Sequence, residues 1–280
     1  MLPIGSVTLA TDGSFSGLLS AYGWAHRAGE LPAAVVLAER ADTGLLFGAP
    51  VRVETDVALA ERVQRGLERA RPGLVGTLLR AFLSERPGME LHILRVVDAV
   101  AAEGADAASD WTFEPTREVR TWAKRVGREA HRMEAFVRFE KHEPAVQLAR
   151  TGDVTAGAPL WLATARPEVN VLPLVGEHFA TRYPALRWAI VDDRRGIALL
   201  HATPAAELGP DDAATEIVPA AALGELRLAA DEAAYQRMWR AYFRAVDIPE
   251  RKNLRLHLRH VPKRYWPYLT EKRAELPAEA

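Results

Sequence analysis

The most regular chemical pattern in this chain is a row of cations in residues 117–139. They recur at intervals of three or four residues, so a helix would place them on one face: Arg117, Arg120, Lys124 and Arg128. Continued to His131, the row is about 21 Å long at about 1.5 Å per residue, which spans several phosphates of one nucleic-acid strand. The apolar residues fall on the opposite side and would pack: Val119, Trp122, Ala123, Val126, Ala130 and Met133. The alternative interpretation is a charged helix face that meets only water.

A second basic segment lies near the C-terminal end. The net charge of the chain is only -1, yet in residues 235–273 basic residues far outnumber acidic ones. Such asymmetry indicates a polyanionic partner. We expect Trp266 to be buried and Lys263 and Arg264 to be exposed. The two segments together predict a nucleic-acid interface made of Arg117, Arg120, Lys124, Arg128, Arg132, Arg251, Lys252, Arg255, Lys263 and Arg264.

An enzyme of this sequence would take its proton-transfer groups from Glu129, His131, His178 and Asp192. Glu129 and His131 are two residues apart and would point about 200° from each other on a helix, so they do not form an acid–base pair. His178 beside Phe179 is typical of a packed histidine, and Asp192 is typical of a hairpin turn. The sequence leaves open whether the chain catalyses a reaction.

The sequence also predicts no metal site and no cofactor. His257 and His260 would share a helical face, but no third ligand stands near them. The chain has no cysteine, which excludes disulfides, thiolate metal sites and an iron–sulfur cluster held by this chain alone. No apolar run is long enough to span a membrane, so we expect a cytoplasmic protein with no membrane partner.

The elements predict an α+β fold. Residues 1–110 form an α-rich N-terminal region that opens with a strand at residues 7–10, a turn and a helix, with a further strand at residues 51–54. Residues 111–280 form an α+β domain with a small, mainly antiparallel sheet and basic C-terminal helices. Its expected strands are residues 136–140 and 160–163 and a hairpin of residues 188–192 and 197–200.

Two segments of the second region carry more specific expectations. Residues 204–226 are rich in alanine, proline and acidic residues, which predicts an exposed acidic insertion. The next helix carries an apolar stripe at helical spacing, which predicts a face buried in the core: Tyr235, Met238, Trp239, Tyr242 and Val246.

Several motifs of the chain resemble those of a known bacterial family. They are the opening Asp12-Gly13-Ser14-Phe15, the central Arg128-Glu129-Ala130-His131-Arg132-Met133 with Phe136-Val137-Arg138-Phe139, and the C-terminal Arg251-Lys252-Asn253 with Pro262-Lys263-Arg264-Tyr265-Trp266. Between them lie Asn170-Val171-Leu172-Pro173-Leu174, His178-Phe179, Trp188-Ala189-Ile190-Val191-Asp192 and Arg195-Gly196. The family carries a domain of unknown function and is assigned to DNA repair or DNA metabolism.

The resemblance implies a biological setting more than a mechanism. Members of the family are encoded beside a radical-SAM DNA repair protein, and some are fused to a uracil-DNA-glycosylase-like domain. We therefore expect a DNA repair or modification protein that binds nucleic acid and assists a radical-SAM partner. Two alternatives stay open: a glycosylase- or hydrolase-like enzyme in its own right, and a subunit that only docks to proteins.

Overall fold

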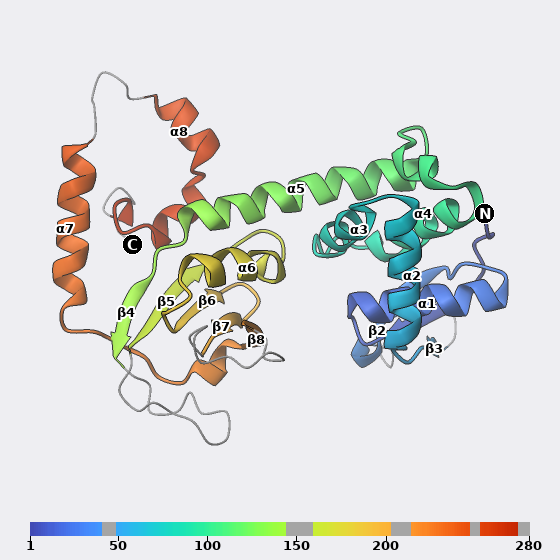
Figure 1. Cartoon of the computed structure of the whole chain (residues 1–280), viewed down its shortest axis with the longest axis horizontal. Coiled ribbons are helices and arrows are strands. Elements are labelled where there is room, and N and C mark those ends of the chain that lie inside the picture. Colours follow the sequence, from blue (N-terminus) through green and yellow to red (C-terminus); the bar gives the residue numbers. More distant parts are fainter. Residues whose placement is uncertain (41–48, 144–158, 203–213, 247–252, 274–280) are drawn as a thin grey trace. The chain divides into compact units, whose positions relative to one another are not determined.

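The computed structural model describes residues 1–40, 49–143, 159–202, 214–246 and 253–273 (Figure 1). The chain divides into two compact units, Met1–Arg128 and Glu129–Ala280. The division falls within the central helix α5 (Glu114–Phe136), so the residues of α5 up to Arg128 belong to the first unit. The domain boundary expected at residue 110 stays a prediction.

The first unit contains a small parallel sheet in the order β2-β1-β3. Its strands are β1 (Thr8–Thr11), β2 (Ala34–Leu37) and β3 (Val51–Arg52). The predictions of β1 and β3 are confirmed, whereas β2 was not predicted. The turn after β1 is a helix cap, because the Ser14 hydroxyl accepts a hydrogen bond of 2.8 Å from the backbone N–H of Gly17.

Helices make up most of the first unit. They are α1 (Phe15–Ala28), α2 (Val57–Ala70), α3 (Leu74–Phe82), α4 (Met89–Glu103), the first part of α5, and two short 3-10 turns, η1 (Ala38–Arg40) and η2 (Ala105–Ser109). Their apolar faces meet in one core, in which Leu18, Leu78 and Ile93 are fully buried. Val119 and Ala123 of α5 join this core, as the helical periodicity predicted.

One expected strand begins later than predicted: Phe136 is the last residue of α5, and residues 137–139 form neither helix nor strand. The sequence predicted a strand at residues 136–140, but α5 continues through Phe136 and strand β4 (Glu140–Glu143) begins at Glu140. The apolar side of the helix explains why Phe136 is helical, because Met133 in the same last turn is 1% exposed. The strand prediction for residues 136–139 was therefore wrong.

The second unit is organised around a six-stranded sheet in the order β8-β7-β6-β5-β4-β9. Every pairing is antiparallel except that of β5 with β6, which is parallel. Besides β4, the strands are β5 (Leu160–Ala165), β6 (Trp188–Asp192), β7 (Ile197–His201), β8 (Glu216–Pro219) and β9 (Arg227–Leu228). The predicted hairpin of β6 and β7 is confirmed, as is the α+β class of the whole fold.

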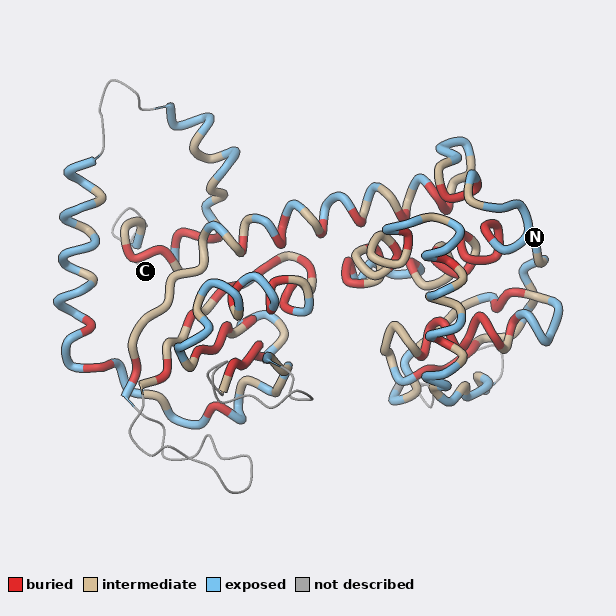
Figure 2. The backbone as a smooth tube through the Cα atoms, viewed as in Figure 1, coloured by how far each residue is buried: buried red, intermediate tan, exposed pale blue. Residues whose placement is uncertain are grey.

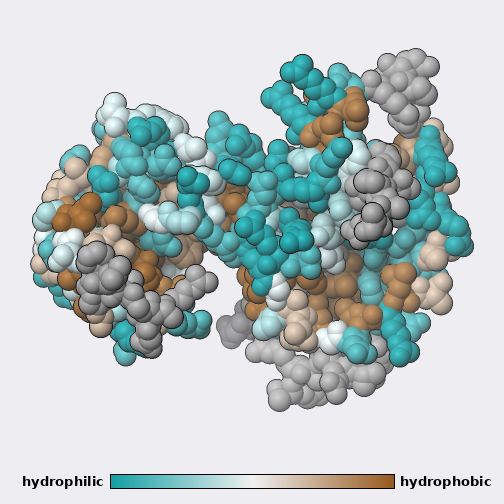
Figure 3. Space-filling model, turned by 180° about the vertical axis from the view of Figure 1, so that it is seen from behind, coloured by the Kyte–Doolittle hydropathy of each residue, from teal (hydrophilic) through white to brown (hydrophobic). Residues whose placement is uncertain are grey.

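Successive side chains of β6 point to opposite sides of the sheet, and both sides are apolar. Trp188 faces helix α6 (Leu172–Arg182), and the rings of Phe179 and Phe139 lie 6.0 Å from the Trp188 ring. Ala189 belongs to a separate apolar cluster with Leu160 on the other face. Seen from behind, hydrophobic side chains gather on the surface of the second unit among hydrophilic residues (Figure 3).

The acidic segment of residues 204–226 is anchored at its C-terminal end. Strand β8 pairs with β7 from Glu216 onward, and the 3-10 turn η4 (Ala220–Leu223) inserts Leu223, which is 3% exposed, beside the sheet. Residues 216–223 are thus tied to the sheet, although Ile217, Pro219, Ala221 and Ala222 among them are exposed. Residues 203–213 lie outside the described part of the chain.

Helix α7 (Glu232–Ala245) contradicts the sequence analysis most clearly. Its apolar stripe was predicted to be core, but the side chains of this α7 face are between 37% and 64% exposed: Tyr235, Met238, Trp239, Tyr242 and Val246. Figure 2 shows the helix as exposed along most of its length with some intermediate positions. The buried residue of α7 is Glu232. Periodicity identified an apolar face correctly, but it does not say what that face meets.

The remaining helical segments of the second unit are α8 (Leu254–His260) and the 3-10 helix η6 (Lys263–Tyr268). Asn253 caps α8 by accepting a hydrogen bond of 2.9 Å from the backbone N–H of Leu256. Within the described ranges, no helix combines the length and apolar character that crossing a membrane requires.

Candidate nucleic-acid interface

Helix α5 has a basic face opposite a buried apolar face, as the spacing of its residues predicted. Arg117, Lys124 and Arg128 are exposed, while Val119 and Val126 on the opposite side are buried at 1% and 0% exposure. Within the described parts of the chain, the side chains of these three cations make no hydrogen bond or ion pair. We call Arg117, Lys124 and Arg128 the free cations of α5. Each is therefore available to pair with an external anion such as a phosphate.

Arg120, the fourth predicted cation of this row, is already engaged. Its Nη1 donates a hydrogen bond of 3.2 Å to the backbone carbonyl of Ala108, and its guanidinium lies 5.2 Å from the centre of the Trp111 ring. The Trp111 side chain is 54% exposed. The sequence analysis did not single out Trp111, because it precedes the helix and takes no part in the periodic pattern.

The predicted C-terminal cations differ from one another in exposure. Arg255 on α8 and Lys263 on η6 are exposed, and Lys263 Nζ lies 5.9 Å from the centre of the buried Trp266 ring. Trp266 is 5% exposed, so the prediction that it packs in the core is confirmed and it offers no face for base stacking. Arg251 and Lys252 lie outside the described residues.

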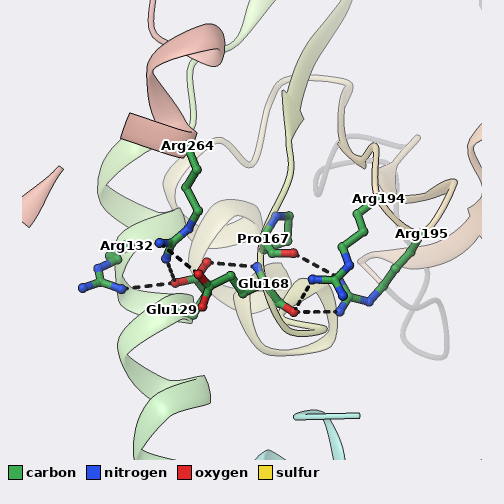
Figure 4. A network of polar contacts seen from close by, with 7 residues as sticks. All are labelled: Glu129, Arg132, Pro167, Glu168, Arg194, Arg195 and Arg264. Atoms are coloured by element: carbon green, nitrogen blue, oxygen red, sulfur yellow. Dashed lines mark hydrogen bonds and ion pairs between the residues drawn. The ribbon is translucent and has the colours of Figure 1, made fainter. Parts of the chain in front are cut away.

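Arg264 is not an exposed cation but part of a polar network around Glu129 (Figure 4). The Glu129 side chain is 3% exposed, and its Oε2 accepts a hydrogen bond of 2.7 Å from Arg264 Nη2. Arg132 Nη1 lies 3.3 Å from the same oxygen, and Oε1 accepts the backbone N–H of Glu168 at 3.2 Å. The expectation that Arg264 is exposed was wrong, because this buried carboxylate holds it.

The surroundings keep Glu129 ionised. Burial alone would raise its pKa, but the hydroxyl of Tyr265, the backbone N–H of Glu168 and the positive charge of Arg264 outweigh burial and lower the pKa below 4.5. Burial and the Glu129 carboxylate in turn raise the pKa of Tyr265. A carboxylate with a lowered pKa is a poor proton donor near neutral pH, so this environment favours a structural role for Glu129.

The network continues through the loop after β5 to the β6–β7 hairpin. The Glu168 carbonyl accepts a hydrogen bond of 2.9 Å from Arg194 Nη1, and the Pro167 carbonyl accepts one of 3.3 Å from Arg195 (Figure 4). Arg195 also pairs at 2.7 Å with Asp192, which is fully buried. Asp192 therefore fixes the hairpin turn, and its carboxylate has no exposed surface for a substrate.

The two candidate histidines stand apart from this network. The His131 side chain is 84% exposed and lies 3.4 Å from Glu134, so the prediction that it points away from Glu129 is confirmed. His178 is exposed on α6, with its ring 5.0 Å from that of Phe179. The structure thus joins Glu129 and Asp192 through one loop but brings neither histidine into hydrogen-bond contact with them. Among the described residues there is no group of three or more potential metal ligands.

Comparison with known proteins gives one match. The model of a family described as a domain of unknown function, DUF4130, matches residues 87–271. No curated protein and no solved structure matches the chain. The matched range contains the whole of α5, the six-stranded sheet and the Glu129 network. Because the match covers well over half of the sequence, the chain belongs to the DUF4130 family of proteins with a domain of unknown function.

Proposed function

We propose that this protein binds DNA through the basic face of α5. The observation that supports the proposal is the set of free cations, Arg117, Lys124 and Arg128, aligned on one side of a helix whose other side is buried. Arg117 and Arg128 are eleven helical steps apart, or about 16 Å, over which a stacked strand carries about five phosphates. The acidic residue between these positions in the sequence, Glu118, lies about 100° around the helix from Arg117, on the flank of the row.

An unpaired cation on a rigid helix is well suited to bind phosphate. Each one that contacts a phosphate releases a condensed counterion, which is the main source of affinity for nucleic acid at low salt. Most arginines of the Glu129 network, by contrast, would have to break a charge-assisted hydrogen bond before they could bind a phosphate. The free cations of α5 therefore contribute more to binding than Arg132 or Arg264.

The role in DNA repair or modification and the radical-SAM partner are part of the same proposal. They follow from the resemblance of the motifs around Glu129 and Arg264 to a family encoded beside such an enzyme. The composition agrees with this division of labour, because a chain without cysteine cannot by itself ligate the iron–sulfur cluster of a radical-SAM enzyme. We propose that this protein holds DNA and the partner supplies the chemistry.

The test is a charge reversal of the free cations, Arg117→Glu, Lys124→Glu and Arg128→Glu together. Fluorescence anisotropy with labelled 20-nucleotide DNA should show affinity reduced by more than about tenfold, because three phosphate contacts are lost. Arg120 stays unchanged in this variant, since its replacement would also disturb Trp111. The free energy of unfolding should change by less than about 0.5 kcal/mol, as expected for exposed positions.

The matched control is Arg62→Glu on the exposed side of α2 in the same unit. It makes the same kind of charge change away from α5, so it should weaken binding by less than about threefold. The loss of affinity should be compared per reversed residue. If Arg62→Glu weakens binding as much per reversed residue as the α5 variant does, the overall charge of the protein governs binding and the α5 face does not. Failure of the wild-type protein to bind any DNA would refute the proposed function.

A second candidate function, docking to a partner protein, is favoured by the exposed α7 face. Five large apolar side chains on one helix side are unusual for a surface that meets only water. We propose the radical-SAM enzyme as the protein that covers this face. Met238→Glu, placed at its most exposed residue, should abolish co-elution of the two purified proteins. Unchanged co-elution would refute this surface as the docking site.

A further inference from the structure

Trp111 offers one free aromatic face beside the free cations. The Arg120 guanidinium lies over its ring, with the Arg120 carbon 5.2 Å from the ring centre, so that side of the indole is covered. The side chain is nevertheless 54% exposed. The exposed area must therefore lie on the opposite face and the edges of the ring. Arg120 is itself held by Ala108, which fixes the covered side in place.

The backbone that carries Trp111 is fixed on both sides. Asp110 Oδ1 accepts hydrogen bonds from the backbone N–H of Thr112 at 2.8 Å and from its hydroxyl at 2.6 Å. The Thr116 hydroxyl donates a buried hydrogen bond of 2.9 Å to the Ala107 carbonyl. An aromatic ring on a fixed turn loses little conformational entropy when a ligand stacks on it.

The hydrogen bonds of Thr112 also lower the pKa of Asp110, so this carboxylate stays charged next to Trp111. Its Oδ1 is occupied by Thr112, and the free cation of α5 that is nearest to Trp111 in the sequence is Arg117. Repulsion by Asp110 and attraction to the free cations both favour the approach of a polyanion to Trp111 from the α5 side. This direction places a nucleic-acid strand along the cations and its end at Trp111.

The surroundings of Trp111 distinguish it from an apolar protein-binding patch. Within residues 58–143, all of which the structure describes, Trp111 is the sole large hydrophobic side chain that is exposed. Trp122 provides a comparison on α5 itself: Arg86 and Arg125 lie 4.5 and 4.8 Å from its ring, and the ring is half-buried in the core. A single exposed ring among cations fits a nucleobase better than a hydrophobic partner surface.

We propose that Trp111 stacks an unpaired base, so that the DNA bound along α5 is single-stranded. The proposal rests on the proposed function of the free cations. In a duplex, neighbouring base pairs cover both faces of each base, whereas an unpaired base presents a face that an aromatic side chain can stack on. Arg120 behind the ring adds positive charge to the same contact. The cations bind the phosphates of the strand, and Trp111 selects its unpaired state.

The experiment compares Trp111→Ala, Trp111→Phe and wild type in anisotropy titrations with labelled dT20 and with a 20-base-pair duplex. Trp111→Ala should weaken binding to dT20 by at least about fivefold and to the duplex by less than about twofold. Trp111→Phe keeps an aromatic face and should retain affinity for dT20 within about threefold. The control is Tyr235→Ala on α7, an aromatic residue of nearly equal exposure, 52%, which should leave both affinities unchanged.

The outcomes separate the two proposals. Equal weakening on dT20 and duplex, or no weakening on either, overturns the stacking role even if the charge reversal on α5 still reduces binding. In that case the proposed function stands and Trp111 is a surface residue. Absence of DNA binding by wild type overturns both. Weakening by Trp111→Phe as large as by Trp111→Ala also overturns the proposal, because stacking needs only an aromatic ring.

Discussion

Replacing Glu129 with glutamine tests whether the buried network is structural. The substitution keeps the shape of the side chain but removes the charge that Arg264 and Arg132 contact at 2.7 and 3.3 Å. The glutamine amide has one oxygen and one NH2 group. In one orientation the NH2 group faces a guanidinium, and in the other it faces the backbone N–H of Glu168, so one of these donors loses its acceptor. A lost charge-assisted hydrogen bond and an unsatisfied buried donor together cost about 3 kcal/mol.

The measurement is urea unfolding followed by circular dichroism at pH 7, with the transition of the second unit fitted separately. Arg132→Gln is the matched control, since it removes only the longer contact from an arginine that is 31% exposed. It should cost less than about 1 kcal/mol. If Glu129 were instead a catalytic group held at a cost in stability, its replacement would be neutral or stabilising.

The lowered pKa of Glu129 also predicts how the effect of Glu129→Gln on the free energy of unfolding changes with pH. The pKa of Glu129 is lowered by folding, so its contribution to stability is present above its ordinary pKa of 4.5 and is lost as the pH falls through the folded value. Glu129→Gln has no group that titrates there. The difference in unfolding free energy between wild type and variant should therefore shrink below pH 4.5. A change below about 1 kcal/mol at pH 7, or a difference that stays constant with pH, would refute the structural role.

Two further substitutions test the places where the structure departs from the sequence prediction. Met238→Glu on the exposed α7 face should change the free energy of unfolding by less than about 0.5 kcal/mol, and a loss above about 2 kcal/mol in chemical denaturation would show that this face is buried. Leu223→Ala should cost about 2 kcal/mol or more because the residue is 3% exposed, and an unchanged thermal midpoint would show that residues 216–223 are not anchored to the sheet.

Local patterns predicted most of the fold. The division of α5 into two faces followed from spacing alone, because the geometry of one helix decides that Lys124 and Val126 lie on opposite sides. The β6–β7 hairpin followed from two apolar runs joined by a short turn ending at Gly196, which has a φ of 64° that favours glycine. These features need no information from distant parts of the chain.

The misjudged features depend on contacts between distant segments. Glu129 and Arg264 are 135 residues apart, so no local pattern indicates that their side chains form an ion pair. The apolar stripe around Met238 has the same spacing as a core helix, and whether it is covered is decided by the neighbouring elements. Trp111 precedes α5 and stands outside every periodic pattern, so its exposure beside Arg120 emerges only in three dimensions.

The salt dependence of DNA binding tests the central claim most directly. The logarithm of the association constant for dT20 should be plotted against the logarithm of salt concentration for wild type and for the variant with Arg117, Lys124 and Arg128 reversed. Each lost phosphate contact flattens the slope by about 0.7, so three contacts predict a slope shallower by about 2. Equal slopes for the two proteins would contradict DNA binding by the α5 face.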